Sequence, residues 1–359
     1  YPALPSVSFY RAIFSGDAKF ENATFKGSTT FKEAIFKEDA SFYGAAFDRD
    51  AVFYDTHFKG DAAFDHTTFI DFTQFRISTF HENATFNNAI FGNFASFQNA
   101  TFIGTAEFVA TTFSSSVNFQ EATFEEPALF QSSANANEEQ NSRAKVFYSL
   151  DCTAARFKSS VSFVNRQFLQ PAVFAGCTFA KAPEFHGCSI HQGTVFPPRQ
   201  NFKDVTSKRA AQAYRTLKLA MEQVRARQEE AMFFALEEES RIYQPDTPFR
   251  EKFASNMYGA LSVFGTNFMR PLWWLLGITV ASFLLYASLT YCPSIVLNYG
   301  QECLYFTIEQ LVRPFSAWLP TGRATLKRII GDDFCLLIII QLLATLQSLA
   351  SLTLITLFI

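Results

Sequence analysis

The sequence predicts a β plus α membrane protein in two parts: a square β-solenoid over residues 1–200, and a helical region that ends in two membrane spans. Phenylalanine recurs along the first part at steps of five and six residues, and the last third contains two long runs without a charged residue. Composition agrees, because 45 Phe stand against 3 Trp and 12 Tyr. Such a bias indicates one apolar role, without a polar group on the ring, that is repeated many times.

The repeat is regular over its first 23 phenylalanines, which alternate five and six residues apart from Phe9 to Phe130. The residue two places before each Phe is small or β-branched: Ala fifteen times, Thr five times, Val twice and Ser once. On an α-helix these steps would give two separate stripes, and on a flat strand they would place successive rings on opposite faces. A chain that turns a corner every five or six residues places every Phe and its small partner inside, with four sides and 22 residues to a turn. The small residue is needed because four rings already fill each layer.

This pattern of a small residue two places before a central Phe resembles the pentapeptide-repeat family. The resemblance implies a right-handed quadrilateral β-helix, although strict alternation of five and six differs from a pure five-residue repeat. Some members of that family mimic DNA, which would require an acidic rod and no membrane spans. The net charge of −3 is near neutral, so we expect no nucleic-acid partner and no DNA mimicry.

The repeat breaks at residues 131–156 and returns in phase at Phe157, because the gap of 27 residues from Phe130 equals 11 + 11 + 5. We interpret residues 132–143 as a surface loop, with Val146 and Cys152 at weak corner positions. The whole rod would then contain about nine coils.

Helix-forming residues follow from Thr206, and the spacing of Tyr214, Leu217, Met221 and Val224 predicts one amphipathic connector helix over 206–243. A second amphipathic helix is predicted over 249–270, lying along a membrane surface. The strings Ala-Tyr-Arg-Thr-Leu-Lys-Leu-Ala-Met-Glu and Phe-Phe-Ala-Leu-Glu in the connector resemble bacterial pentapeptide-repeat membrane proteins.

Residues 271–359 form the predicted transmembrane domain. Residues 271–292 and 335–359 carry no charge, and both runs are long enough to cross a hydrocarbon core of about 30 Å. Trp273 and Trp274 at the edge of the first run are typical of a membrane interface. The Lys and Arg residues of the connector favour a cytoplasmic rod at the bacterial inner membrane, although Arg313, Arg323, Lys327 and Arg328 between the spans oppose this orientation.

Residues 303–319 are apolar but too short to cross, and Pro314 and Pro320 interrupt them. The order of span, short segment and span resembles the pore module of two-helix cation channels, so a re-entrant segment is expected. Glu309 and Arg313, four apart, would form a charged ring at a constriction or a self-paired helix among headgroups. Gln341, Thr345, Ser348 and Ser351 share one side of the second span and would either line the pore or hold helices together. The Thr-Val-Gly-Tyr-Gly filter of potassium channels is missing from the sequence.

Cysteine and histidine suggest little chemistry. Cys292 and Cys303 are candidates for a disulfide or are two unrelated thiols. Cys177 and Cys188 fall at the small inward position and His186 points outward, so we expect no metal site. His57, His66 and His81 lack a catalytic constellation, and we predict no cofactor and no enzymatic activity.

The sequence therefore supports two hypotheses. The first is an oligomeric, channel-like membrane protein with a cytoplasmic rod, formed by four copies if it encloses a pore. The alternative is a membrane-anchored scaffold whose rod binds a partner protein. Both require membrane lipid as a partner.

Overall fold

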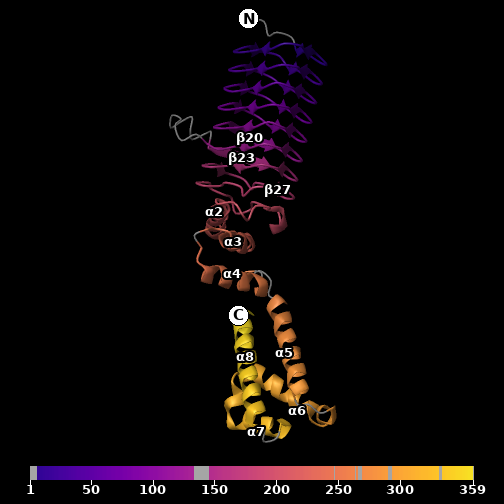
Figure 1. Cartoon of the computed structure of the whole chain (residues 1–359). Helices are drawn as coiled ribbons and strands as arrows, with labels where there is room; N and C mark the ends of the chain where they lie inside the picture. The colour runs from indigo at the N-terminus through magenta and orange to yellow at the C-terminus, as the bar shows by residue number, and fades with distance from the viewer. Residues whose placement is uncertain are drawn as a thin grey trace. The chain divides into compact units, whose positions relative to one another are not determined.

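The computed structural model describes residues 6–132, 145–245, 247–262, 264–265, 269–289, 293–330 and 334–358. The chain divides into two compact units, Tyr1–Thr247 and Pro248–Ile359 (Figure 1). The first unit is a parallel β-solenoid closed by two helices, and the second consists of helices alone.

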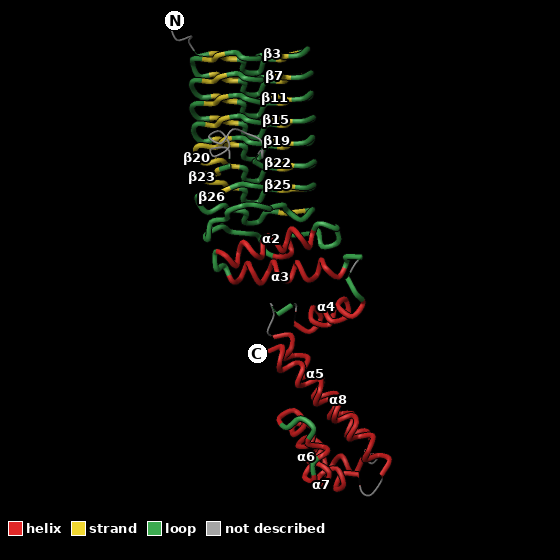
Figure 2. Tube along the Cα trace, turned by 90° about the vertical axis from the view of Figure 1, so that its left-hand side faces the viewer, coloured by secondary structure: helices red, strands yellow, loops and turns green. Residues whose placement is uncertain are grey.

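Each turn of the solenoid has four sides, and the strands on each side pair in parallel with those 22 residues away (Figure 2). The first side contains β1 (Val7–Ser8), β5 (Thr29–Thr30), β9 (Ala51–Val52), β13 (Thr73–Gln74) and β17 (Ala95–Ser96). The second side contains β2 (Ile13–Phe14), β6 (Ile35–Phe36), β10 (His57–Phe58), β14 (Thr79–Phe80), β18 (Thr101–Phe102), β21 (Thr123–Phe124), β24 (Arg156–Phe157) and β27 (Thr178–Phe179).

The third side is the column of seven strands labelled in Figure 2: β3 (Ala18–Lys19), β7 (Ala40–Ser41), β11 (Ala62–Ala63), β15 (Ala84–Thr85), β19 (Ala106–Glu107), β22 (Ala128–Leu129) and β25 (Val161–Ser162). The fourth side contains β4 (Thr24–Phe25), β8 (Ala46–Phe47), β12 (Thr68–Phe69), β16 (Ile90–Phe91) and β26 (Gln167–Phe168), and the longer strands β20 (Thr112–Asn118) and β23 (Val146–Asp151) link it to the first side. Regular strands thus cover about seven turns instead of nine, and isolated bridges such as Val173↔Val195 hold the remainder.

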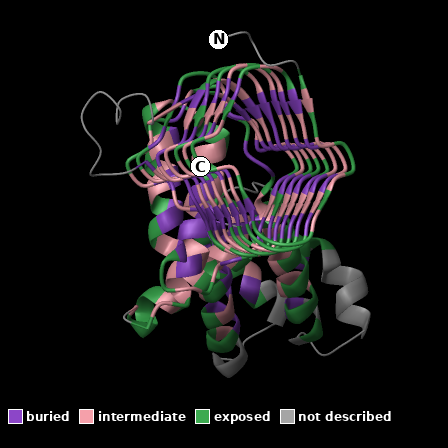
Figure 3. Ribbon diagram, turned by 90° about the horizontal axis from the view of Figure 1, so that it is seen from above, coloured by how far each residue is buried: buried purple, intermediate pink, exposed green. Residues whose placement is uncertain are grey.

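Phenylalanine rings fill the interior, as the sequence predicts. Buried residues line the inside of the stacked turns when they are seen end-on (Figure 3). Phe36, Phe58 and Phe80 stack nearly parallel with centroids 4.9 Å apart. Rings on neighbouring sides meet edge to face, as Phe58 and Phe64 do, or tilted by about 41°, as Phe53 and Phe58 do. Each buried ring contributes roughly 1.5–3 kcal/mol, so stability is distributed along the rod.

The alternation of five and six residues follows from two kinds of corner. On the five-residue sides the second residue after Phe has a positive φ, for example Asn22 at 55° and Asn88 at 57°. The amide of the next small residue then donates to the Phe carbonyl, as Ala23 N does to Phe20 O at 3.1 Å, which closes a tight turn. A six-residue side has one more residue and turns without this strained conformation.

Hydroxyls at the small interior position complete the hydrogen bonding of the corners. Thr67 Oγ1 donates to Phe42 O at 2.7 Å, and Thr111 Oγ1 donates to Phe86 O at 2.7 Å. Both carbonyls lie one turn earlier in the chain. Thr therefore substitutes for Ala at this position because its hydroxyl finds an acceptor inside the core.

Residues 133–144 lie outside the described residues, and they include all of the predicted loop 132–143 except Ser132. Phe147, and not Val146, takes the interior position, and its ring stacks on Phe113 at 5.3 Å and on Phe168 at 5.5 Å. The prediction for Val146 is wrong because a shift in register between β20 and β23 advances the chain by one residue. Cys152 does lie at a corner and is fully buried.

Arg166 is a fully buried arginine at the small interior position of this irregular turn. Its guanidinium donates to Phe130 O, to Thr111 O at 2.9 Å and to Phe108 O at 3.0 Å, and it lies over the Phe147 ring at 4.7 Å. Burial lowers the pKa of Arg166 to about 9, which still leaves it charged at neutral pH. One long side chain thus serves carbonyls of two successive turns.

Two helices close the C-terminal end of the solenoid after the short helix η1 (Arg199–Asn201): α2 (Ala210–Gln223) and α3 (Arg227–Ile242). The predicted single connector helix over 206–243 is therefore interrupted, and Arg225 at the break has a φ of 59°. The Phe233 ring meets Phe196 and Phe202 edge to face at 5.1 and 5.5 Å. The hairpin forms because both helices can then bury apolar residues on the last turn.

The second unit contains α4 (Phe249–Ser262), α5 (Met269–Leu289), α6 (Pro293–Val312), η2 (Ser316–Trp318), α7 (Pro320–Ile330) and α8 (Phe334–Phe358). α4 is shorter than the predicted helix 249–270. α5 contains residues 271–289 of the first predicted span and α8 contains residues 335–358 of the second, and each helix is long and apolar enough to cross a membrane. The predicted segment 303–319 is not a separate short helix, because α6 begins ten residues earlier, at Pro293, and ends at Val312.

We predict that Arg166→Ala destabilises the solenoid by roughly 3–5 kcal/mol, because it leaves a cavity and removes the donor from three carbonyls. Thr67→Ala is the matched control, since it removes one hydrogen bond in the same interior column, where Ala45 and Ala89 already occur. It should cost about 1 kcal/mol. Chemical denaturation monitored by circular dichroism measures both, and equal losses would contradict the role given to Arg166.

Candidate functional site

Phe72 and Phe94 are the two phenylalanines of the described solenoid that do not occupy interior positions. They lie on adjacent turns, 22 residues apart, and their rings stack outside the core with centroids 5.8 Å apart and planes 16° apart. Both side chains are half-buried. An aromatic pair on the outer wall is not required by the packing of the core, so it is a candidate for recognition.

Side-chain hydrogen bonds fix the backbone beneath this pair. Asp71 Oδ1 accepts from Phe72 N at 3.0 Å, and Asn93 Oδ1 accepts from Phe94 N at 2.8 Å. Asn93 Nδ2 donates to Asp71 Oδ1 at 3.3 Å and connects the two turns. The turns also approach closely at Gly92, where an added Cβ would come within 2.9 Å of Ile70 O. The rings are therefore presented on a rigid support.

Two isoleucines extend the apolar surface. The Ile70 side chain is 53% exposed and that of Ile90 is 38% exposed, and the strand register places them beside the same two turns. We call Ile70, Phe72, Ile90 and Phe94 the flank patch. The column to which the two Phe residues belong continues as Asp50 one turn earlier and Ser116 one turn later, so the patch is confined to two turns.

Carboxylates outnumber cations at the N-terminal edge of the flank patch. Asp48 and Asp50 precede Ile70 and Phe72 by one turn, and Asp71 lies within the patch turn itself. Arg49 is the basic residue among them. This edge therefore favours a partner with Lys or Arg next to its apolar side chains.

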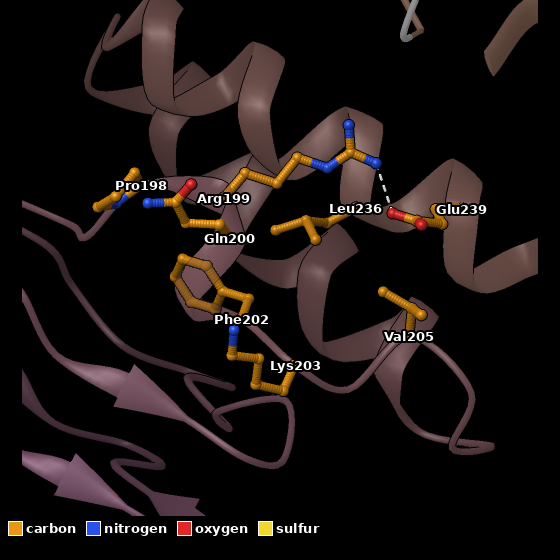
Figure 4. Close-up of a pocket in the computed structure, with 8 residues that line it drawn as sticks. All are labelled: Pro198, Arg199, Gln200, Phe202, Lys203, Val205, Leu236 and Glu239. Atoms are coloured by element: carbon orange, nitrogen blue, oxygen red, sulfur yellow. Dashed lines mark hydrogen bonds and ion pairs between the residues drawn. The ribbon is translucent and has the colours of Figure 1, made fainter. Parts of the chain in front are cut away.

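A hollow of about 600 Å³ lies where the last solenoid turn meets α3 (Figure 4). It is lined by Pro198, Arg199, Gln200, Phe202, Lys203, Val205, Leu236 and Glu239. Arg199 forms an ion pair with Glu239 across it. The hollow is shallow, and its main charges are engaged with each other, so it is a weaker candidate for binding than the flank patch.

Cys177 and Cys188 lie at the small inward position of the repeat, as the sequence predicts. Cys177 Sγ donates to Cys152 O at 2.7 Å and Cys188 Sγ donates to Phe163 O at 2.9 Å, so both thiols act like the interior hydroxyls. Burial raises the pKa of each to about 12. His186 Nδ1 instead contacts Thr216 Oγ1 at 3.0 Å. Among the described residues, no group of three or more His, Cys, Asp or Glu side chains is placed to hold a metal ion.

Three of the predicted pore residues contact the turn after α6. Gln341 Nε2 donates to Ala317 O at 2.9 Å, Thr345 Oγ1 accepts from Trp318 Nε1 at 2.8 Å, and Ser348 Oγ accepts from Phe315 N at 3.2 Å. Ser351 is buried, and its hydroxyl has no hydrogen-bond partner in the described part of the chain. These polar groups on α8 therefore hold the α6–α7 connection against α8.

The remaining predicted site residues have other surroundings. Arg313 is exposed and Glu309 is half-buried, and the contact between them is a backbone bond from Arg313 N to Glu309 O at 2.7 Å. Cys303 is buried, whereas Cys292 lies outside the described residues, so their disulfide stays a prediction. The flank patch was not predicted from the sequence. Its signal is the two phenylalanines that fall out of phase with the repeat.

The geometry defines a parallel β-solenoid built from repeats and followed by helices. Residues 9–57 and 86–134 match the family model for pentapeptide repeats (9 copies), so the solenoid is built from pentapeptide repeats. No curated protein and no solved structure matches the chain. The right-handed sense of the coil stays a prediction.

We predict that Cys152, Cys177 and Cys188 resist alkylation in the folded protein. Burial raises the pKa of all three thiols, to about 12 for Cys177 and Cys188, so they are almost entirely protonated at pH 8, and the protonated form does not attack iodoacetamide. Peptide mapping by mass spectrometry should find these residues unmodified at pH 8 and labelled in denaturant. Labelling of the native protein would contradict the inward positions of these thiols, of which Cys152 and Cys177 are buried and Cys188 is half-buried.

We also predict that the double variant Phe72→Asp, Phe94→Ser folds with less than about 1 kcal/mol of lost stability, because surface changes have small effects. The same column already contains Asp50 one turn before Phe72 and Ser116 one turn after Phe94, so it accepts both substituting residues. Phe75→Ala, at an interior position, should cost about 3–5 kcal/mol. Thermal unfolding compares them, and equal losses would show that the flank patch is part of the core.

Proposed function

We propose that the protein is a membrane-anchored scaffold whose solenoid binds a partner protein at the flank patch. The observation that carries this proposal is the stacked pair Phe72 and Phe94, held outside a core that is already complete. The partner presents aromatic or aliphatic side chains next to Lys or Arg, which complement the carboxylates at the patch edge. No catalytic or cofactor chemistry is needed for this role.

Exposure of the apolar helices supports the anchor. In the window Met269–Tyr286 of α5 only 11% of the residues are buried, and in Leu337–Ile355 of α8 only 39%. A core helix of a water-soluble protein would be mostly buried, whereas a helix in lipid exposes Leu, Ile and Trp. We propose that α5 and α8 cross the bacterial inner membrane and that the rod is cytoplasmic, as the basic connector favours.

The apolar face of α4 supports an interfacial position next to the first span. Phe249, Phe253 and Met257 are spaced by four residues and are 81%, 59% and 43% exposed. Arg250 and Lys252 lie beside them. Such a helix places its aromatic side in the boundary between headgroups and acyl chains.

A channel is the second candidate, and one observation favours it. The turn after α6 is bonded to Thr345 and Ser348, well inside α8, which is the arrangement expected of a re-entrant segment. Hydrogen bonds within the subunit engage Gln341, Thr345 and Ser348, and this weakens their assignment to a pore. Planar-bilayer recordings of the purified protein test the channel. If the protein conducts no ions, the scaffold remains as the function.

For the scaffold we predict that a random 12-residue peptide library, panned on the full chain in lipid nanodiscs, yields peptides that combine apolar residues with Lys or Arg. Their dissociation constants, measured by fluorescence anisotropy, should rise at least about tenfold for Phe72→Asp, Phe94→Ser. Ile103→Ser, which changes an exposed apolar residue on another side of the solenoid, is the matched control and should leave them unchanged. No enrichment over empty nanodiscs, or equal affinity for the double variant, would overturn the proposal.

A further inference from the structure

α8 provides a scale of depth for the second unit. Its 25 residues from Phe334 to Phe358 correspond to about 37 Å of helix. Ser348 follows Phe334 by about 21 Å and precedes Phe358 by about 15 Å along the axis. If α8 spans a hydrocarbon core of about 30 Å, Thr345 and Ser348 lie near its middle.

The end of α6 lies at the same depth. Ser348 Oγ contacts Gln310 O at 3.4 Å and accepts from Phe315 N at 3.2 Å, and Thr345 Oγ1 accepts from Trp318 Nε1 at 2.8 Å. Gln347 Nε2 also donates to Thr307 O at 3.1 Å. Four contacts therefore fix residues 307–318 beside the middle of α8.

Two charged side chains accompany this segment. Glu309 directly precedes Gln310, and Arg313 lies between the end of α6 and Phe315. Arg313 is exposed and Glu309 is half-buried on the outer face of α6, together with Tyr305 and Val312, which are 64% and 70% exposed. Among the ion pairs of the described residues, none involves Glu309 or Arg313.

Charges in this position cannot face lipid at a modest cost. An Arg side chain can reach toward the headgroups from near a helix end, but the middle of the core is about 15 Å from either surface. Intramembrane Glu and Arg almost always face protein or water and pair with one another. The outer face of α6 is therefore incomplete in a single subunit.

We infer that this face is an interface with a second copy of the chain, in which Glu309 of one subunit pairs with Arg313 of the next. The charges are complementary, they lie at one depth, and they share a face with apolar side chains that can pack between helices. Both a closed dimer and a ring around a cavity satisfy this pairing. The inference rests on the proposed membrane position of α5 and α8.

A charge exchange tests the pairing. The full chain, labelled with one fluorophore and reconstituted into phosphatidylcholine and phosphatidylglycerol liposomes, is counted by single-molecule photobleaching at increasing protein density. Arg313→Glu and Glu309→Arg should each raise the density needed for association at least about tenfold, because like charges then meet. The double exchange Glu309→Arg, Arg313→Glu should restore association. Arg323→Glu, on the exposed surface of α7, is the control and should leave it unchanged.

The outcomes separate this inference from the anchor. Extraction of the wild-type protein by alkaline carbonate without detergent would refute the membrane position itself. Retention in the membrane with single-step photobleaching at all densities would leave the anchor intact and overturn the interface. Association that is insensitive to the exchange would overturn the pairing of Glu309 with Arg313.

Discussion

The stacking of phenylalanine rings at the spacing of a β-ladder is the constraint on which the first unit depends. Stacked ring centroids lie 4.5–5.2 Å apart in the regular turns, close to the separation of hydrogen-bonded strands. One geometry thus satisfies the aromatic contacts and the backbone hydrogen bonds together. The residue two places before each Phe must be small because the rings already fill the layer. The corners must be tight because each side has only five or six residues. Around residues 113–168, where the ring spacing widens, a buried arginine supplies the missing donors.

Much of this unit could be predicted from the sequence because the spacing of the repeat shows which residues point inward and how many residues form one turn. The phase of 23 phenylalanines determines the interior, and in the structure these rings belong to one continuous hydrophobic core. The prediction failed at Val146, where a register shift, which has no local signal, moved the interior position to Phe147. It also missed the break at Arg225, because residues on both sides favour a helix and the hairpin forms only by packing on the solenoid end.

The second unit was less accessible to sequence reasoning. Charge-free runs predict two long apolar helices, and α5 and α8 agree with this prediction. The sequence placed Glu309 on an apolar segment but did not show that this segment lies beside the middle of α8, which follows from contacts such as that between Phe315 and Ser348. The flank patch was not predicted because the repeat pattern identifies only the interior phenylalanines. Phe72 and Phe94 fall outside the spacing of five and six residues, and this departure is what places them on the outer surface.

Outward positions of the solenoid can vary in sequence without changing its interior. Each outward column runs along the axis with one residue per turn, and its side chains take no part in the aromatic stack. One such column contains Ser28, Asp50, Phe72, Phe94 and Ser116, which differ in size and polarity although the interior beneath them is the same. Outward residues of a recognition surface can therefore be substituted one at a time, while the stacked interior keeps the solenoid stable.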